Sequence, residues 1–163
     1  MGWLLPSSVL WQSLQGSTRP PGELIDVSDG RRLHVRVMGA EHPGPTVLLE
    51  HRHGLTVSSW GWLQPRLAEH VTVVSYDRPG SGWSDAGDAD FSAVAADLRV
   101  ALDRLDVPGP YVPVGFSLGG LYARAFSASH PREVAGLVLL DPAHEDQMAR
   151  LPGSRGGEPT GSG

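Results

Sequence analysis

Polar and apolar residues alternate over residues 32–38, and this period of two predicts a β-strand with one buried face. The odd-numbered positions are apolar, so His34 on the opposite face should be a solvated strand residue rather than a catalyst. Residues 23–26 predict a second short strand. The turn-forming residues at 28–30 should join the two strands as a hairpin.

Unbroken apolar runs mark a second kind of strand, which is covered on both faces. Such runs lie within three predicted strands, residues 46–50, 71–76 and 134–140, and a fourth lies within residues 111–116. Helical spacing of apolar residues separates them. It predicts a helix over 58–69 with Ser58 or Ser59 as its cap, one over 91–105 capped by Asp90, and one from Leu118 to the stop at Pro131. Alternating strands and helices predict an α/β fold: a three-layer structure with a mostly parallel sheet.

The two ends of the chain differ from this core. Residues 1–22 are a lead-in and linker, and their apolar stretch within 1–15 is too short for a bilayer span and has no basic flank. A clipped membrane anchor is the alternative for this stretch. Residues 151–163 are rich in glycine and proline and should be disordered. We therefore expect one domain over residues 23–150.

Composition narrows the classes of function. The 163 residues carry a net charge of −5 without a basic patch, which argues against nucleic-acid binding. Cysteine is absent, so disulfides, thiol catalysis and cysteine-based metal sites are excluded. His51 and His53 flank Arg52, but no third ligand is spaced to complete a metal site, and we expect neither a metal nor a cofactor. The localisation stays open; a cytoplasmic location is favoured, with membrane association of the amino terminus as the alternative.

One motif carries chemistry: Gly115-Phe116-Ser117-Leu118-Gly119, between a predicted strand and a predicted helix. In this context a Gly-x-Ser-x-Gly sequence forms a tight turn that exposes the serine at the carboxyl end of a sheet. Ser117 is therefore the candidate nucleophile, and the backbone N–H of Leu118 a candidate oxyanion donor. The loop after residue 50 should lie at the same edge of the sheet, where the Leu55 N–H could be a second donor.

Together with the Asp77-Arg78-Pro79-Gly80-Ser81-Gly82 loop and the run 138–146, this motif resembles the α/β-hydrolase superfamily, in particular its esterase-like serine hydrolases. The resemblance covers residues 20–147. It implies hydrolysis of an ester, amide, epoxide or related bond by a serine, an acid and a histidine in that chain order. Asp77 and Arg78 could be an acid and its partner, but we expect instead that they brace their own loop, residues 77–85.

In that family a lid and two further strands, which carry the acid and the histidine, follow the strand that ends here at Asp141. The sequence to Gly163 has no such pattern. We therefore expect the amino-terminal portion of the fold, with a sheet incomplete at its carboxyl-terminal side. Asp141 and His144 are the candidates for a substitute acid and base; the alternative is that they only end a strand and begin a lid.

Three functions remain open from the sequence. The first is a serine hydrolase acting on a small-molecule ester. The second is a truncated or split family member that lacks the triad histidine and is non-catalytic alone. The third is a binding module that uses the cleft without turnover. In each case the apolar edge of strand 134–140 would lack a partner, which predicts self-association through it or pairing with a complementing carboxyl-terminal half.

Overall fold

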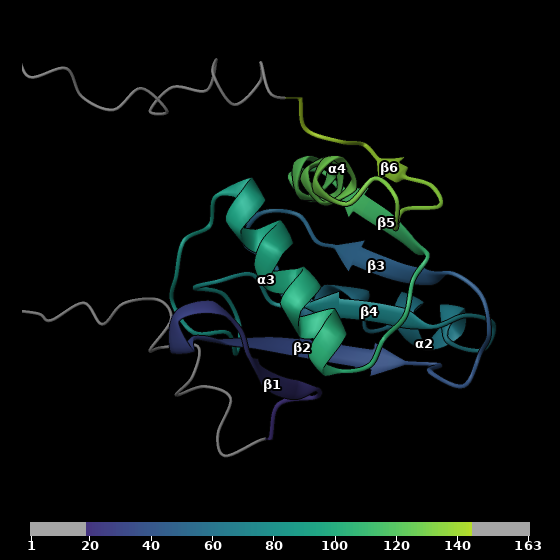
Figure 1. The fold of residues 1–163 in the computed structure, drawn as a ribbon, viewed down its shortest axis with the longest axis horizontal. Helices are drawn as coiled ribbons and strands as arrows, with labels where there is room; N and C mark the ends of the chain where they lie inside the picture. Colours follow the sequence, from purple (N-terminus) through teal and green to yellow (C-terminus); the bar gives the residue numbers. More distant parts are fainter. Residues whose placement is uncertain (1–18, 145–163) are drawn as a thin grey trace, which may run out of the picture.

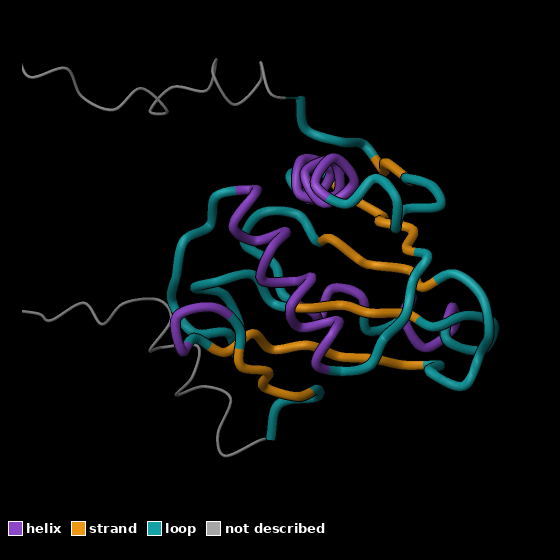
Figure 2. Tube along the Cα trace, viewed as in Figure 1, coloured by secondary structure: helices purple, strands orange, loops and turns teal. Residues whose placement is uncertain are grey.

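The computed structural model describes residues 19–144, which form a six-stranded mixed sheet with helices on both faces (Figures 1 and 2). The strands are ordered β1-β2-β4-β3-β5-β6 across the sheet. β1 and β2, and β2 and β4, pair antiparallel; all other pairs are parallel. The predicted fold class, a three-layer α/β structure with a mostly parallel sheet, is confirmed. The lead-in and the tail lie largely outside the described residues.

The predicted hairpin is present. β1 (Glu23–Asp26) and β2 (Arg32–Met38) are joined by the short 3-10 helix η1 (Ser28–Gly30), in which Asp29 and Gly30 both have positive φ. The alternation along β2 was misleading on one point, because His34 is fully buried. The segment that follows β4 crosses this face of the strand, and Ser84 accepts a hydrogen bond from the His34 backbone N–H. The prediction of a solvated His34 is therefore wrong.

The central strands are β3 (Thr46–Glu50), β4 (Val73–Tyr76) and β5 (Tyr111–Phe116). Successive side chains point to opposite faces, so each strand supplies two apolar cores. Leu48 and Val74 face one core, while Leu49 and Val73 face the other. This two-sided burial explains why these strands show as unbroken apolar runs in the sequence.

Helices α3 (Phe91–Arg104) and α4 (Gly119–Ser129) cover one face of the sheet, as Figure 1 shows. The Asp90 carboxylate caps α3 by accepting from the Ser92 N–H, as predicted. The other face is covered by η2 (Val57–Trp60) and α2 (Leu63–Leu67). Instead of one helix over 58–69 there are thus two short pieces, and neither serine forms a side-chain cap.

The last strand, β6 (Val138–Leu140), is shorter than the predicted 134–140. Val134 still forms an isolated parallel bridge with Tyr111, but the chain between them is not strand. β6 lies at the end of the described sheet, next to β5. Val138 and Leu140 are each 42% exposed there, so among residues 19–144 this apolar edge has no covering strand.

A membrane-spanning helix is not found between residues 19 and 144: none of the helices there has the length and hydropathy that crossing a bilayer requires. The apolar stretch within residues 1–15 and the tail at 151–163 lie outside the described residues. The expectations for both stay predictions.

Candidate active site

Ser117 stands at an abrupt turn between β5 and α4. β5 ends at Phe116, α4 begins at Gly119, and Ser117 has a φ of 53°, in the left-handed region that a serine rarely adopts. The turn is held on both sides, because the Ser117 N–H donates to Leu140 O at 3.1 Å and the Ser117 carbonyl accepts from Gly120 N–H at 2.9 Å. Strain of this kind persists only where the surroundings impose it, and it is frequent at functional sites.

The two glycines of the motif are needed because backbone lies against them. A Cβ on Gly115 would lie 2.6 Å from the Gly119 carbonyl oxygen. A Cβ on Gly119 would lie 2.1 Å from the Glu50 carbonyl oxygen. β3, β5 and α4 therefore approach one another at the turn more closely than any side chain would permit.

The candidate oxyanion donors lie on two elements beside this turn. Leu118 precedes the first residue of α4, where backbone N–H groups have no partner within the helix and the helix dipole is positive. Leu55 belongs to the β3–η2 loop, residues 51–56, which leaves the sheet at Glu50, the residue paired with Gly115 in the β3–β5 ladder. Gly54, with φ of 72°, turns this loop just before the half-buried Leu55.

Arg78 lies beneath this loop and is buried. Its guanidinium donates to His51 O at 2.8 Å and to Arg52 O at 3.0 Å, and it lies 3.5 Å from a Glu50 carboxylate oxygen. The same group stacks over the Tyr122 ring of α4 at 4.5 Å. One side chain thus contacts the end of β3, the loop and the elbow helix.

Asp77 is a fully buried acceptor for three donors. Its carboxylate accepts from Val57 N–H at 2.8 Å and from Trp83 N–H at 3.1 Å, and it pairs with His34 Nδ1 at 2.8 Å. A Cβ on Gly82 would lie 2.1 Å from the same carboxylate. The contact with Trp83 N–H agrees with the prediction that Asp77 braces its own loop, whereas the Arg78 side chain holds the β3–η2 loop instead.

Glu50 is buried in the same region and was missed in the sequence, where it only ends an apolar strand. Tyr76 donates to its carboxylate at 2.6 Å. Burial raises the pKa of Glu50 to about 7, against the opposing effects of Arg78 and Tyr76. The pKa of the neighbouring His51 shifts in the opposite direction, because burial and the charge of Arg78 both lower it, to about 4. A carboxyl group within an otherwise apolar strand was the available signal.

Asp141 and His144 follow β6 and are both exposed. Their segment passes directly along the elbow, because the Ala143 N–H donates to the Ser117 carbonyl at 2.9 Å. Asp141 itself has a positive φ of 42°. This places the segment beside the elbow backbone but does not establish a role for either side chain, so both stay predictions.

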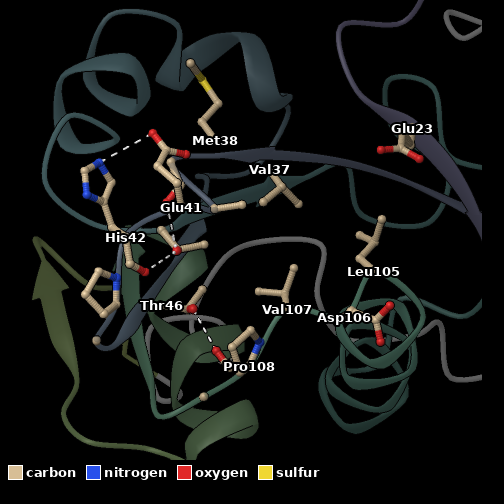
Figure 3. Close-up of a pocket in the computed structure, with 16 residues that line it drawn as sticks. Glu23, Val37, Met38, Glu41, His42, Thr46, Leu105, Asp106, Val107 and Pro108 are labelled. Carbon is tan, nitrogen blue, oxygen red and sulfur yellow. Dashed lines mark hydrogen bonds and ion pairs between the residues drawn. The ribbon is translucent and has the colours of Figure 1, made fainter.

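A depression of about 590 Å³ lies at the opposite end of the sheet. Figure 3 shows its lining, with His42 on one side, Leu105 and Asp106 on the other, and Thr46 beside Pro108. The Thr46 hydroxyl donates to Pro108 O at 2.8 Å, so these two polar groups of the lining already form a hydrogen bond with each other. Within residues 19–144 no three potential metal-ligating side chains gather to hold an ion. Ser117 does not line this depression.

Comparison with known proteins agrees with this geometry. Residues 46–162 match the model of the alpha/beta hydrolase family, and the chain belongs to that family. An uncharacterized protein of Schizosaccharomyces pombe is 30% identical over an alignment of 162 positions that covers 82% of this chain and 30% of that protein. The resemblance drawn from the motifs is thereby confirmed.

Solved structures give the same result. An esterase from Thermogutta terrifontis superposes with a TM-score of 0.67 at 28% identity, over 74% of this chain and 46% of that one. An esterase from Exiguobacterium antarcticum gives 0.64 at 25% identity, over 74% and 45%. The chain thus spans less than half the length of these esterases and under a third of the yeast protein.

Proposed function

We propose that this chain carries the nucleophile and the oxyanion-binding part of a serine hydrolase that acts on ester or related acyl bonds. The observation that carries the proposal is the backbone of Ser117, held at a φ of 53° between β5 and α4. Both superposed esterases support it, since hydrolysis is the activity their names state.

The proposed reaction uses three kinds of group: the Ser117 hydroxyl, a base, and the backbone N–H donors. Ser117 Oγ attacks the carbonyl carbon of the ester, and a base accepts the hydroxyl proton as the new bond forms. The carbonyl oxygen becomes negative and is stabilised by the N–H groups of Leu118 and Leu55. The alcohol leaves with a proton returned by the base, and water then releases the acid from Ser117. In this proposal His144, oriented by Asp141, is the candidate base within the chain.

A fluorophosphonate probe, which forms a covalent bond only with an activated serine, tests the proposal on the full 163-residue chain. Labelling should disappear in Ser117→Ala and persist in the matched control Ser127→Ala, whose hydroxyl lies further along α4 and donates to Ala123 O. Loss of labelling in His144→Gln would support the substitute base. Labelling that survives Ser117→Ala would refute the assignment of the nucleophile.

A second candidate is a family member that is inactive until a complementing segment binds. It is favoured by the exposed edge of β6, together with the partial coverage of the esterases. Here the chain alone stays unlabelled, and labelling at Ser117 appears when the carboxyl-terminal part of an esterase relative is supplied. Labelling of the chain alone would exclude this candidate.

A further inference from the structure

We propose that Asp77 and Arg78 are positioning residues that hold the two ends of the β3–η2 loop and so fix its position relative to the elbow helix. The consequence for reactivity rests on the proposed function, because it assumes that the loop presents an oxyanion donor. The positioning itself is a property of the contacts among the described residues.

Arg78 holds the start of the loop. Its two terminal nitrogens donate to two consecutive carbonyls, His51 O at 2.8 Å and Arg52 O at 3.0 Å. The second nitrogen also lies 3.0 Å from His51 Nδ1. Loop carbonyls that would otherwise need water are thereby satisfied inside the protein.

Asp77 holds the end of the loop. Its Oδ1 accepts from the N–H of Val57, the first residue of η2, at 2.8 Å. Its other oxygen accepts from Trp83 N–H and pairs with the fully buried His34. The carboxylate is thus fixed from two further directions. Since Asp77 and Arg78 are consecutive, the end of β4 sets the separation between the two ends of the loop.

The brace also reaches the elbow. The Arg78 guanidinium stacks on Tyr122 of α4, 4.5 Å from the ring centre, while Gly119 at the start of this helix lies against the Glu50 carbonyl. A planar guanidinium can donate in its plane and stack on a ring face at once, which an ammonium group cannot. Arginine at position 78 can therefore link the loop and the helix in one arrangement.

The test compares Arg78→Lys with the matched control Arg99→Lys. Like Arg78, Arg99 forms carboxylate pairs, here with Asp103 and Glu133, and lies over a tyrosine ring, but it belongs to α3 and does not contact the loop. Hydrogen exchange of the full chain should speed up at least about tenfold in peptides covering residues 51–57 in Arg78→Lys and not in Arg99→Lys, because the carbonyls of His51 and Arg52 lose the donors that hold the loop in place. Asp77→Asn is the second variant, with faster exchange expected in the same peptides and also at Trp83, whose N–H donates to this carboxylate.

Fluorophosphonate kinetics supply a readout that a general loss of stability would not reproduce. Removing one oxyanion donor typically costs about 10²–10³ in rate. A displaced Leu55 in Arg78→Lys should therefore lower the maximal labelling rate at least about tenfold while the half-saturating probe concentration changes little. Arg99→Lys should label at the wild-type rate.

The two readouts separate the two claims. Unchanged exchange in residues 51–57 in both brace variants overturns the positioning role. Faster exchange with an undiminished labelling rate overturns its connection to the reaction. If the wild-type chain is not labelled at all, the proposed function fails, and exchange alone then decides whether Asp77 and Arg78 position the loop.

Discussion

Replacing the buried Glu50 by glutamine should make the protein more resistant to rising pH. Glutamine has nearly the same shape and can still accept the hydrogen bond from Tyr76, which lies 2.6 Å from the carboxylate. It removes the titration of Glu50, whose pKa burial displaces upward from 4.5 to about 7. The variant therefore isolates the cost of ionising this carboxyl group inside the fold.

The sign follows from proton binding. Between pH 4.5 and 7 the folded protein holds a proton on Glu50 that the unfolded chain has released, so stability falls as pH rises through this range. At about 1.4 kcal/mol for each pKa unit, a displacement from 4.5 to about 7 corresponds to about 3 kcal/mol. The free energy of unfolding of the wild type minus that of Glu50→Gln should fall by about this amount between pH 4 and pH 8.

His51 acts in the opposite direction over a similar range. Its pKa is lowered from 6.5 to about 4, so its contribution to stability rises with pH between these values. In the wild type the two contributions nearly cancel. Glu50→Gln should then expose the histidine contribution and gain stability between pH 4 and 6.5, whereas the wild-type profile from these two groups stays nearly flat.

The assay is urea unfolding followed by circular dichroism at half-unit steps from pH 4 to pH 8. Asp85→Asn is the control, because Arg32 lowers the pKa of Asp85 at the surface. Its stabilising contribution is fully present above pH 3.8 and is lost only at lower pH, so the wild-type minus Asp85→Asn difference should stay constant from pH 4 to pH 8. A wild-type minus Glu50→Gln difference that is constant or rises with pH would refute the reasoning, since it would mean that Arg78 outweighs burial.

Three further predictions follow from single contacts. Gly82→Ala should destabilise the fold by at least about 2 kcal/mol in urea unfolding, because the added methyl group would lie 2.1 Å from a buried carboxylate oxygen. Gly80→Ala has a similar positive φ but open space around it, so it should cost only about 1 kcal/mol; equal losses would contradict the argument. Val138→Lys should raise the monomer fraction in size-exclusion chromatography with light scattering, because it puts a charge on the exposed β6 edge. The control Trp62→Lys changes a more exposed residue away from that edge and should leave the monomer fraction unchanged. A wild-type chain that is already monomeric would exclude self-association. Asp90→Ala should destabilise the fold through loss of the α3 cap, and an unchanged midpoint of urea unfolding would show that the cap is not needed.

The fold could be predicted from the sequence because most of its signals are local. Apolar runs identify β3, β4 and β5, and the glycine-flanked serine identifies the turn between β5 and α4. His34 could not be placed in the same way. Whether the second face of β2 is solvated depends on the segment 77–85 folding across it, and the alternation within the strand carries no information about that segment.

In the candidate site, too, the residues of a local motif could be predicted, and those that depend on distant contacts could not. Ser117 and Leu118 follow from one short motif, but the environment of Glu50 depends on contacts with Tyr76 and Arg78, which lie 26 and 28 residues further along the chain. The sequence suggested that Asp77 and Arg78 brace their own loop, which follows β4. It could not indicate that both also contact the loop after the neighbouring strand β3, which carries the second candidate donor. Such contacts are set by strand order, which the sequence pattern alone does not specify.

In the proposed mechanism, stabilisation of the oxyanion and transfer of the proton would have separate structural origins. The proposed donors are the backbone N–H groups of Leu55 and Leu118, in the segments that follow β3 and β5, and these segments contact each other at Gly119 and are held by Arg78. Backbone donors need only the correct turn, so they depend little on which side chain serves as base. Proton transfer instead requires a side chain within hydrogen-bond reach of Ser117 Oγ. We therefore expect mutations in the brace to change the stabilisation of charge, and mutations in the segment after β6 to change the pH dependence of reaction.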